Sequence, residues 1–342
     1  MSAKFRTEVR IPDFRRKTGY RSPSMFIGSC FTENIGGKMS ALKYPVDINP
    51  FGNLYNPVSV ASGIRFLMRN KKFSKSDLIK HNGLWHSFYH HSRFSSVNAD
   101  QSLETINERL CASQEFLKNA DFLFVTFGTA WVYEYKPTGQ IVSNCHKIPE
   151  KEFSRYRLKT GKIVEELTDL LSELRNFNPG LEVVFTVSPI RHLRDGAVEN
   201  QRSKSVLLLA VDQLVEDLGE EHCSYFPAYE IVMDELRDYR FYDEDMTHLS
   251  SAAVNHIWEK FQNSLIEEES LKISAEVKKI ISAIEHKPFN RVTKEHLRFL
   301  QKSLQKTCSL EAEFLYINLE FEKGFFSKQI ADIENRLKEL ES

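Results

Sequence analysis

The feature that most limits how this chain can fold is a pair of nearly continuous apolar runs, DFLFVTFG at 121–128 and LEVVFTVSPI at 181–190. A strand with one wet face alternates apolar and polar residues, whereas a strand buried on both faces is apolar at successive positions. Gly128 and Pro189 close the two runs, and SMFIGS at 24–29 is a shorter run of the same kind. The pattern predicts buried strands of a parallel sheet.

Helical patterns separate these runs. The stretch KIVEELTDLLSELRNFNPG ends at Pro179 and Gly180, and SVLLLAVDQLVEDLG ends at Gly219. Strands that alternate with helices predict right-handed crossovers and a three-layer α/β domain. The first helix places five apolar residues at helical spacing: Ile163, Leu167, Leu170, Leu171 and Leu174.

The composition changes after about residue 266, where Lys, Glu, Leu and Ile dominate and only Pro288 and Gly324 offer clear breaks. We therefore expect an α/β domain over 1–265 and a C-terminal helical extension over 266–342. The last segment carries a two-heptad apolar seam, which suits either a helix packed on its own domain or a homodimer contact through the C-terminal helices. The seam consists of Phe326, Ile330, Ile333, Leu337 and Leu340.

Charge and cysteine usage exclude several classes of protein. Lys plus Arg total 46 and Asp plus Glu 47, a balance that gives no reason to expect nucleic acid or an anionic membrane surface as a partner. No apolar run approaches the roughly 18 residues of a membrane span, and the N-terminus lacks the apolar centre of a secretory signal. The five cysteines are scattered without a C-x-x-C pair. These features predict a cytoplasmic chain with reduced thiols and no cofactor.

The tripeptide Gly28-Ser29-Cys30 stands where an apolar run ends and a helical pattern begins. A serine hydroxyl becomes a nucleophile only when a base takes its proton, and N–H groups must face the developing oxyanion. A strand end that leads into a helix N-terminus offers such N–H groups. Ser29 is therefore a candidate nucleophile, with an ordinary Gly-Ser turn as the other interpretation. The G-x-S-x-G elbow of α/β-hydrolases is absent.

A candidate base lies near the other end of the α/β region. In DEDMTHLSSAAVNHIW, Asp245 precedes His248 by three residues, and Ser250 or Ser251 suits the start of a helix. A carboxylate at this spacing can hold one imidazole tautomer and stabilise the imidazolium. The pair therefore suits the base and its orienting acid.

These residues resemble the GSCFA family within the SGNH (GDSL-type) hydrolases. The resemblance covers about residues 5 to 260, in order, and leaves the C-terminal segment outside. Its blocks are GSCFTENIG, NPFGNLYNP at 49–57, GLWHSFYHHSRFS at 83–95, FVTFGTAWVY at 124–133, NCHKIP at 144–149, TVSPIRH at 186–192 and YFPAYEIVMDELRDYRFYDEDMTHLS at 225–250.

The resemblance implies a flavodoxin-like α/β/α sandwich around a parallel sheet of about five strands. It implies acyl-ester hydrolysis or transfer through a triad of Ser29, His248 and Asp245. Cys30 would lie one residue into the helix, where its N–H could donate to the oxyanion and its thiol could pack as a small hydrophobe.

The remaining oxyanion donors are implied only in part. Gly52 in NPFGN matches the glycine of the superfamily's second block. The third block usually reads Gly-x-Asn-Asp, but the corresponding stretch here starts at Gly128 and contains no Asn. Three residues could replace that Asn: Thr129, Asn144 and His146.

Two further groups of polar residues are candidates for lining the site. His86 and His90 would suit a zinc pair on a helix, but their aromatic neighbours favour a strand or loop, so lining the cleft is the preferred role for His86. Arg191 and His192 follow the 181–190 run and could meet an anionic group of a substrate or form a solvated loop. Asn200 and Lys204 are weaker candidates in the same region.

The sequence thus predicts a serine esterase that forms a covalent acyl-enzyme on a small-molecule or glycan ester. Two alternatives stay open: an O-acyltransferase acting on a sugar or glycan hydroxyl, and a non-catalytic binding or assembly protein on the same scaffold.

Overall fold

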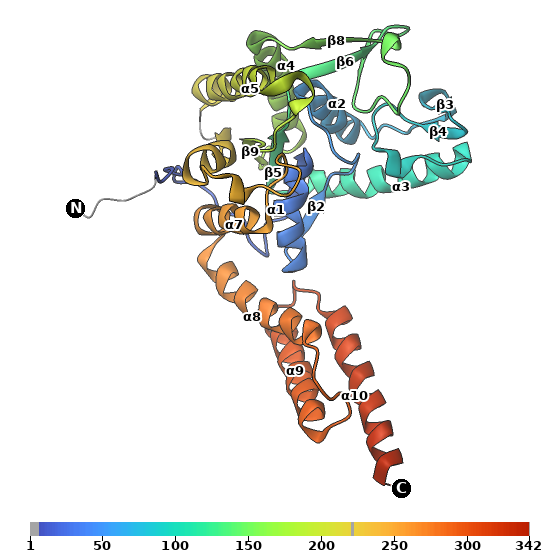
Figure 1. The fold of residues 1–342 in the computed structure, drawn as a ribbon, viewed down its shortest axis with the longest axis vertical. Coiled ribbons are helices and arrows are strands. Elements are labelled where there is room, and N and C mark those ends of the chain that lie inside the picture. The colour runs from blue at the N-terminus through green and yellow to red at the C-terminus, as the bar shows by residue number, and fades with distance from the viewer. Residues whose placement is uncertain (1–6, 220–221, 342) are drawn as a thin grey trace, which may run out of the picture. The chain divides into compact units, whose positions relative to one another are not determined.

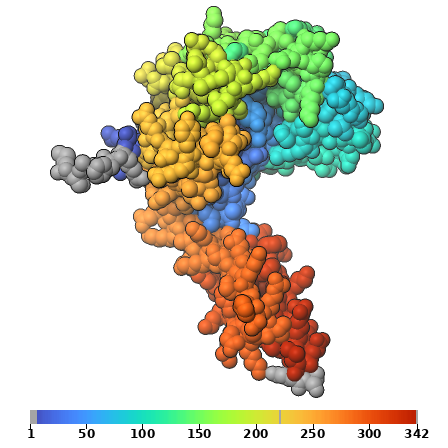
Figure 2. All heavy atoms as spheres, in the orientation of Figure 1, coloured from blue at the N-terminus to red at the C-terminus, as the bar shows by residue number. Residues whose placement is uncertain are grey.

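The computed structural model describes residues 7–219 and 222–341, which form two compact units. The first unit holds residues up to Thr18, Ser22–Lys38 and Val46–Leu265. The second holds Gly19–Arg21, Met39–Pro45 and the chain from Ile266 onward. The elements of both can be followed by label in Figure 1 and by colour in Figure 2.

The first unit is built on a parallel five-stranded sheet, as the apolar runs predict. Its order is β10-β9-β5-β1-β2, so the five strands, counted along the chain, lie in the order 2-1-3-4-5 of flavodoxin-like sheets. All four neighbouring pairs are parallel. The strands are β1 (Ser24–Gly28), β2 (Val46–Ile48), β5 (Phe122–Phe127), β9 (Glu182–Val187) and β10 (Cys223–Tyr225).

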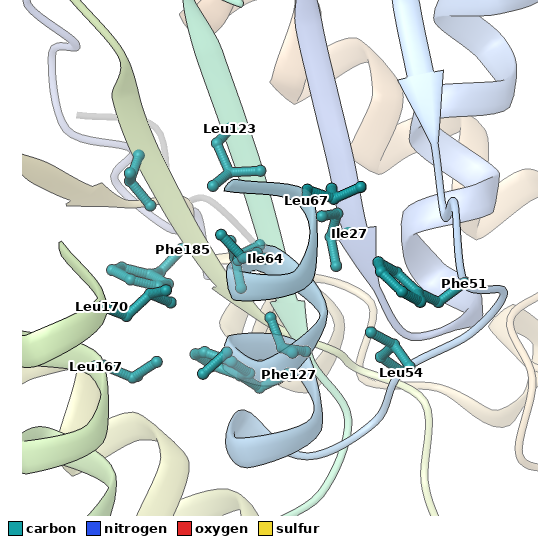
Figure 3. Close-up of a cluster of buried hydrophobic side chains, with 14 of the residues drawn as sticks. Ile27, Phe51, Leu54, Ile64, Leu67, Leu123, Phe127, Leu167, Leu170 and Phe185 are labelled. Atoms are coloured by element: carbon teal, nitrogen blue, oxygen red, sulfur yellow. The ribbon is translucent and has the colours of Figure 1, made fainter. Parts of the chain in front are cut away.

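Helices cover both faces of this sheet. One face packs on α2 (Pro57–Met68), α4 (Thr160–Phe177) and α5 (Gly196–Leu218), with α3 (Ala99–Lys118) beside α2. Figure 3 shows this layer, in which strand residues such as Ile27 and Phe127 meet side chains of α2 and α4. The other face packs on α1 (Cys30–Ala41) and α7 (Ser251–Leu265), where Phe124 and Phe261 are in ring contact. The predicted three-layer α/β/α architecture is confirmed.

The helical pattern in KIVEELTDLLSELRNFNPG, at 162–180, corresponds to α4, and all five of its expected apolar residues are buried. The second predicted helix ends at Gly219, whose φ of 83° lies in the left-handed region that glycine tolerates. Periodicity therefore identified both helices and the buried face of α4, whereas α5 begins at Gly196, nine residues before the predicted stretch.

Two small antiparallel sheets are inserted into the α/β framework. One pairs β3 (Ile79–His81) with β4 (Leu84–His86), and the other has the order β7-β6-β8. The latter strands are β6 (Trp131–Tyr135), β7 (Gln140–Val142) and β8 (Phe153–Arg157). A single helical turn, α6 (Ala228–Glu230), follows β10.

The second unit contains α8 (Glu268–Glu285), α9 (Lys294–Glu313) and α10 (Glu320–Glu341). Two earlier segments of the chain belong to it through Tyr20 and Tyr44, whose rings stack with centroids 4.1 Å apart. The Tyr20 N–H donates to Ser270 Oγ at 3.2 Å, and Lys43 Nζ lies 2.7 Å from the buried carboxylate of Glu322. Segments distant in sequence therefore complete this helical unit.

The last helix differs from expectation in one respect. Gly324 lies inside α10, not at a break, and the break between α9 and α10 falls over 314–319. An exposed glycine costs a helix only about 1 kcal/mol, which flanking helical residues can offset. Within the seam Phe326 and Ile333 are buried, whereas Leu340 is exposed. Across the described part of the chain, we find no helix with the length and apolar character that spanning a bilayer requires.

Candidate active site

Ser29 follows β1 at the carboxyl end of the sheet, at the point where the strand order reverses. Gly28 before it has φ of 150°, and a Cβ there would lie 2.2 Å from the backbone oxygen of Thr126. Only glycine fits this approach of β1 to β5. The Ser29 side chain is fully buried, and its Oγ makes no hydrogen bond to any described residue.

The turn after β2 supports this strand end. Asn49 accepts a hydrogen bond from the Gly28 N–H on its Oδ1 at 2.9 Å, and its backbone oxygen accepts from the Gly52 N–H at 2.8 Å. Gly52 has φ of 80°, and a Cβ there would lie 2.2 Å from His91 Cβ. A tight turn thus accounts for Gly52, whose N–H donates to the Asn49 backbone oxygen in this structure.

Asp245 and His248 contact each other as the D-x-x-H spacing predicts. Asp245 Oδ2 lies 2.5 Å from His248 Nδ1, and Oδ1 accepts from the backbone N–H groups of Thr247 and His248 at 2.9 and 2.8 Å. These hydrogen bonds hold the pKa of the Asp245 carboxyl well below its usual range, and the one from the His248 side chain contributes most. Because Nδ1 donates to the carboxylate, neutral His248 presents the lone pair of Nε2 as a base.

His192 is the residue that relates Ser29 to His248. The point where a Cβ would stand on Gly128 lies 3.3 Å from Ser29 Cβ and 3.4 Å from His192 Nε2. Burial, then the charges of Lys204 and His248, lower the pKa of His192 to about 4. His192 thus lies close to Ser29 and interacts electrostatically with His248, although no hydrogen bond joins Ser29 Oγ to His248 in this structure.

Lys204 lies beneath the same strand ends. Its side chain is fully buried in α5, and Nζ donates to Gly128 O and Ser188 O, each at 2.6 Å. Burial lowers the pKa of Lys204 to about 7, with Cys30 opposing the shift. No carboxylate in the described residues pairs with this amine, so two backbone carbonyls satisfy it.

Cys30 and Tyr55 lie beside Ser29 as neutral groups. Burial is the largest cause that raises the pKa of the Cys30 thiol, and it also raises the pKa of the Tyr55 hydroxyl. The rings of Tyr55 and His192 meet edge to face with centroids 5.4 Å apart. Cys30 thus keeps its proton at neutral pH, which is consistent with the sequence preference for Ser29 as the nucleophile.

The three residues expected to replace the missing Asn are held by other contacts. Thr129 Oγ1 lies 3.0 Å from Ser203 Oγ and accepts from the Trp131 N–H. Asn144 Oδ1 accepts from the His146 N–H, and His146 Nε2 bonds to Ser87 O at 2.7 Å. Within the described residues, no hydrogen bond or ring contact links any of the three to Ser29.

His86 ends β4, as the strand or loop interpretation predicts, and stacks on His146 with centroids 4.4 Å apart. Its Nδ1 lies 2.7 Å from Ser95 Oγ. No group of three His, Cys, Asp or Glu residues suited to a metal ion occurs among the described residues. This histidine pair therefore belongs to the loop framework, and none of its hydrogen bonds or ring contacts within the described residues involves Ser29.

Arg191 borders a polar pocket of about 400 Å³. Tyr229, Tyr239 and Tyr242 line the same pocket, and the Arg191 guanidinium lies 5.7 Å from the centre of the Tyr242 ring. Tyr242 precedes the Asp245–His248 turn, and Arg191 precedes His192. The pocket therefore adjoins both loops of the candidate site.

The chain belongs to the GSCFA family, whose sequence model matches residues 23–261. A second model, described as the C-terminal domain of GSCFA domain proteins, matches residues 277–332, so the family likeness extends into the helices that the sequence resemblance left outside.

Among solved structures, one similar chain is the acetyl xylan esterase Est2A from the rumen bacterium Butyrivibrio proteoclasticus. It is 14% identical with a TM-score of 0.36, over 75% of this chain and 66% of that chain. No curated protein matches this sequence significantly.

Proposed function

We propose that this protein is a serine ester hydrolase of the SGNH type, with Ser29 as nucleophile, His248 as base and Asp245 as the residue that orients it. The contact between Asp245 Oδ2 and His248 Nδ1 carries the proposal, because it fixes the tautomer that a base requires. Support also comes from the position of Ser29 at the reversal point of a flavodoxin-like sheet, where this architecture binds its ligands.

The reaction proceeds in two steps. His248 Nε2 takes the Ser29 proton while Oγ bonds to the ester carbonyl carbon, and collapse of the tetrahedral intermediate breaks the ester C–O bond. The alcohol leaves with the proton from His248, and the acyl group stays on Ser29. Water, deprotonated by His248, then releases the acid and restores the serine.

Closing the triad requires a local shift. Ser29 is fully buried and its Oγ is unpaired, so side chains above it must move before a substrate carbonyl reaches it. Catalytic hydrogen bonds that are long or absent in a free enzyme often form only with substrate bound.

Labelling with a fluorophosphonate probe tests the assignment. The wild type is expected to be labelled at Ser29 and to hydrolyse p-nitrophenyl acetate, whereas Ser29→Ala loses both and Ser172→Ala, an exposed serine of α4, keeps both. Equal labelling of wild type and Ser29→Ala would remove Ser29 from the mechanism. An unlabelled, inactive wild type would favour the non-catalytic alternative.

Acyl transfer to a sugar hydroxyl is the second candidate, and the burial of Ser29 favours it. A site that excludes water protects an acyl-enzyme until an alcohol attacks in place of water. The pocket lined by Arg191 and three tyrosines offers polar and aromatic groups for such an acceptor. A labelled acetyl group recovered on an added oligosaccharide would favour transfer over hydrolysis.

A further inference from the structure

The candidate site is short of oxyanion donors. The Ser29 N–H donates to Thr126 O at 3.1 Å, and the Gly128 N–H donates to Tyr55 O at 2.8 Å. The Gly52 N–H is likewise committed to Asn49 O. A tetrahedral intermediate on Ser29 therefore needs a side-chain donor in addition to the helix N-terminus at Cys30.

His192 presents an unused ring nitrogen at this place. Its Nε2 is buried and has no partner among the described residues. A Cβ placed on Gly128 would lie 3.4 Å from this nitrogen and 3.3 Å from Ser29 Cβ, so the two side chains flank the same point. A buried polar atom without a partner costs free energy, and such atoms in native structures commonly mark a functional group. A substrate oxygen near Ser29 would give this nitrogen its missing partner.

Contacts on other sides hold the backbone and the ring of His192. The backbone N–H of His192 donates to Asn200 Oδ1 at 3.0 Å, and the Tyr55 ring meets the imidazole edge to face. Support of this kind lets a donor act without rearranging when charge develops on the substrate.

The electrostatic surroundings keep His192 neutral. The titratable groups that interact with it are Lys204 and His248, and with burial as the largest cause they lower its pKa to about 4. A neutral imidazole carries one N–H, and a neutral histidine can polarise a carbonyl without becoming an imidazolium. His192 can therefore donate at neutral pH without competing with His248 for the Ser29 proton.

We propose that His192 donates an Nε2–H hydrogen bond to the oxyanion formed when Ser29 attacks an ester carbonyl, in place of the Asn that the third block lacks. The inference rests on the proposed function. It makes His192 a catalytic residue that keeps its Nε2 proton and transfers none during the reaction.

Glutamine tests the donor role because its amide nitrogen reaches about as far as Nε2 of histidine but cannot act as a base. We expect His192→Ala and His192→Phe to lower kcat for p-nitrophenyl acetate by about 10²–10³ with little change in KM. We expect His192→Gln to retain kcat within about tenfold of wild type. His296→Gln in α9 is the matched control and keeps wild-type rates.

The possible outcomes separate the two proposals. A wild type that is active through Ser29, with His192→Ala equally active, overturns the donor role alone. Loss of kcat in His192→Gln as deep as in His192→Ala also overturns it, since the residue would then act as a proton acceptor. A wild type with neither hydrolysis nor Ser29 labelling overturns the proposed function and the donor role together. Rescue by Gln, with wild-type circular dichroism in every variant, supports both.

Discussion

The buried amine of Lys204 makes the stability of this protein depend on pH in a defined direction. The folded pKa is about 7, compared with 10.5 for an ordinary lysine, and burial is the cause. Below about pH 7 the amine is protonated in both the folded and the unfolded chain. Between about pH 7 and pH 10 the unfolded chain holds this proton and the folded chain does not, so the free energy of unfolding rises with pH.

The size of the effect follows from the shift. Each pH unit in this window adds about 1.4 kcal/mol to the free energy of unfolding. The contribution of Lys204 to that free energy therefore grows by roughly 2–3 kcal/mol between about pH 7 and pH 9. Lys204→Met removes this pH-dependent contribution to the free energy of unfolding, and it leaves Gly128 O and Ser188 O without their donor. The variant should therefore be less stable than wild type by a margin that widens with pH over this range.

Urea denaturation followed by tryptophan fluorescence measures this difference. The three tryptophans, Trp85, Trp131 and Trp258, all lie in the first unit, so the signal reports the unit that contains Lys204. Lys162→Met, at an exposed position of α4, is the control and should not reproduce the trend. A stability difference between wild type and Lys204→Met that stays flat from about pH 7 to pH 9 would refute the reasoning, because the folded amine would then not titrate in this window.

Three further substitutions test other parts of the structure. Gly28→Ala should destabilise the first unit by about 3 kcal/mol or more, because a Cβ would overlap the Thr126 carbonyl; thermal melting measures this. Asp245→Asn should lower kcat for p-nitrophenyl acetate by about 10²–10⁴ with KM little changed, and an unchanged kcat would exclude the orienting role. Lys43→Met should cost about 3 kcal/mol, seen as a lower melting temperature of the helical signal, since Glu322 would keep a buried carboxylate without its partner.

Local patterns predicted the framework of this protein well. The strands β5 and β9 were recognisable because residues buried on both faces are apolar in succession, and α4 because its five core residues repeat with the helix. The contact of Asp245 with His248 could also be predicted from the sequence, because residues three positions apart can meet within one turn.

Features that depend on contacts between distant parts of the chain could not be predicted from the sequence in this way. Lysine is rarely fully buried, so nothing in the sequence marked Lys204 for the interior. Nothing in the sequence shows which polar residue lies beside Ser29, because that proximity is set by how β9 and its following loop align with β1. His192 had the right signal, a polar residue after a buried strand, but its unpaired nitrogen is visible only in three dimensions.

The membership of Tyr20 and Tyr44 in the helical unit has a consequence for biosynthesis. Both tyrosines leave the ribosome early, yet Ser270, which each of them contacts, is translated more than 200 residues later. The nascent chain must therefore form the sheet before Tyr20 and Tyr44 can make their hydrogen bonds to Ser270. The helical unit can therefore be completed only after the strands of the sheet have been synthesised.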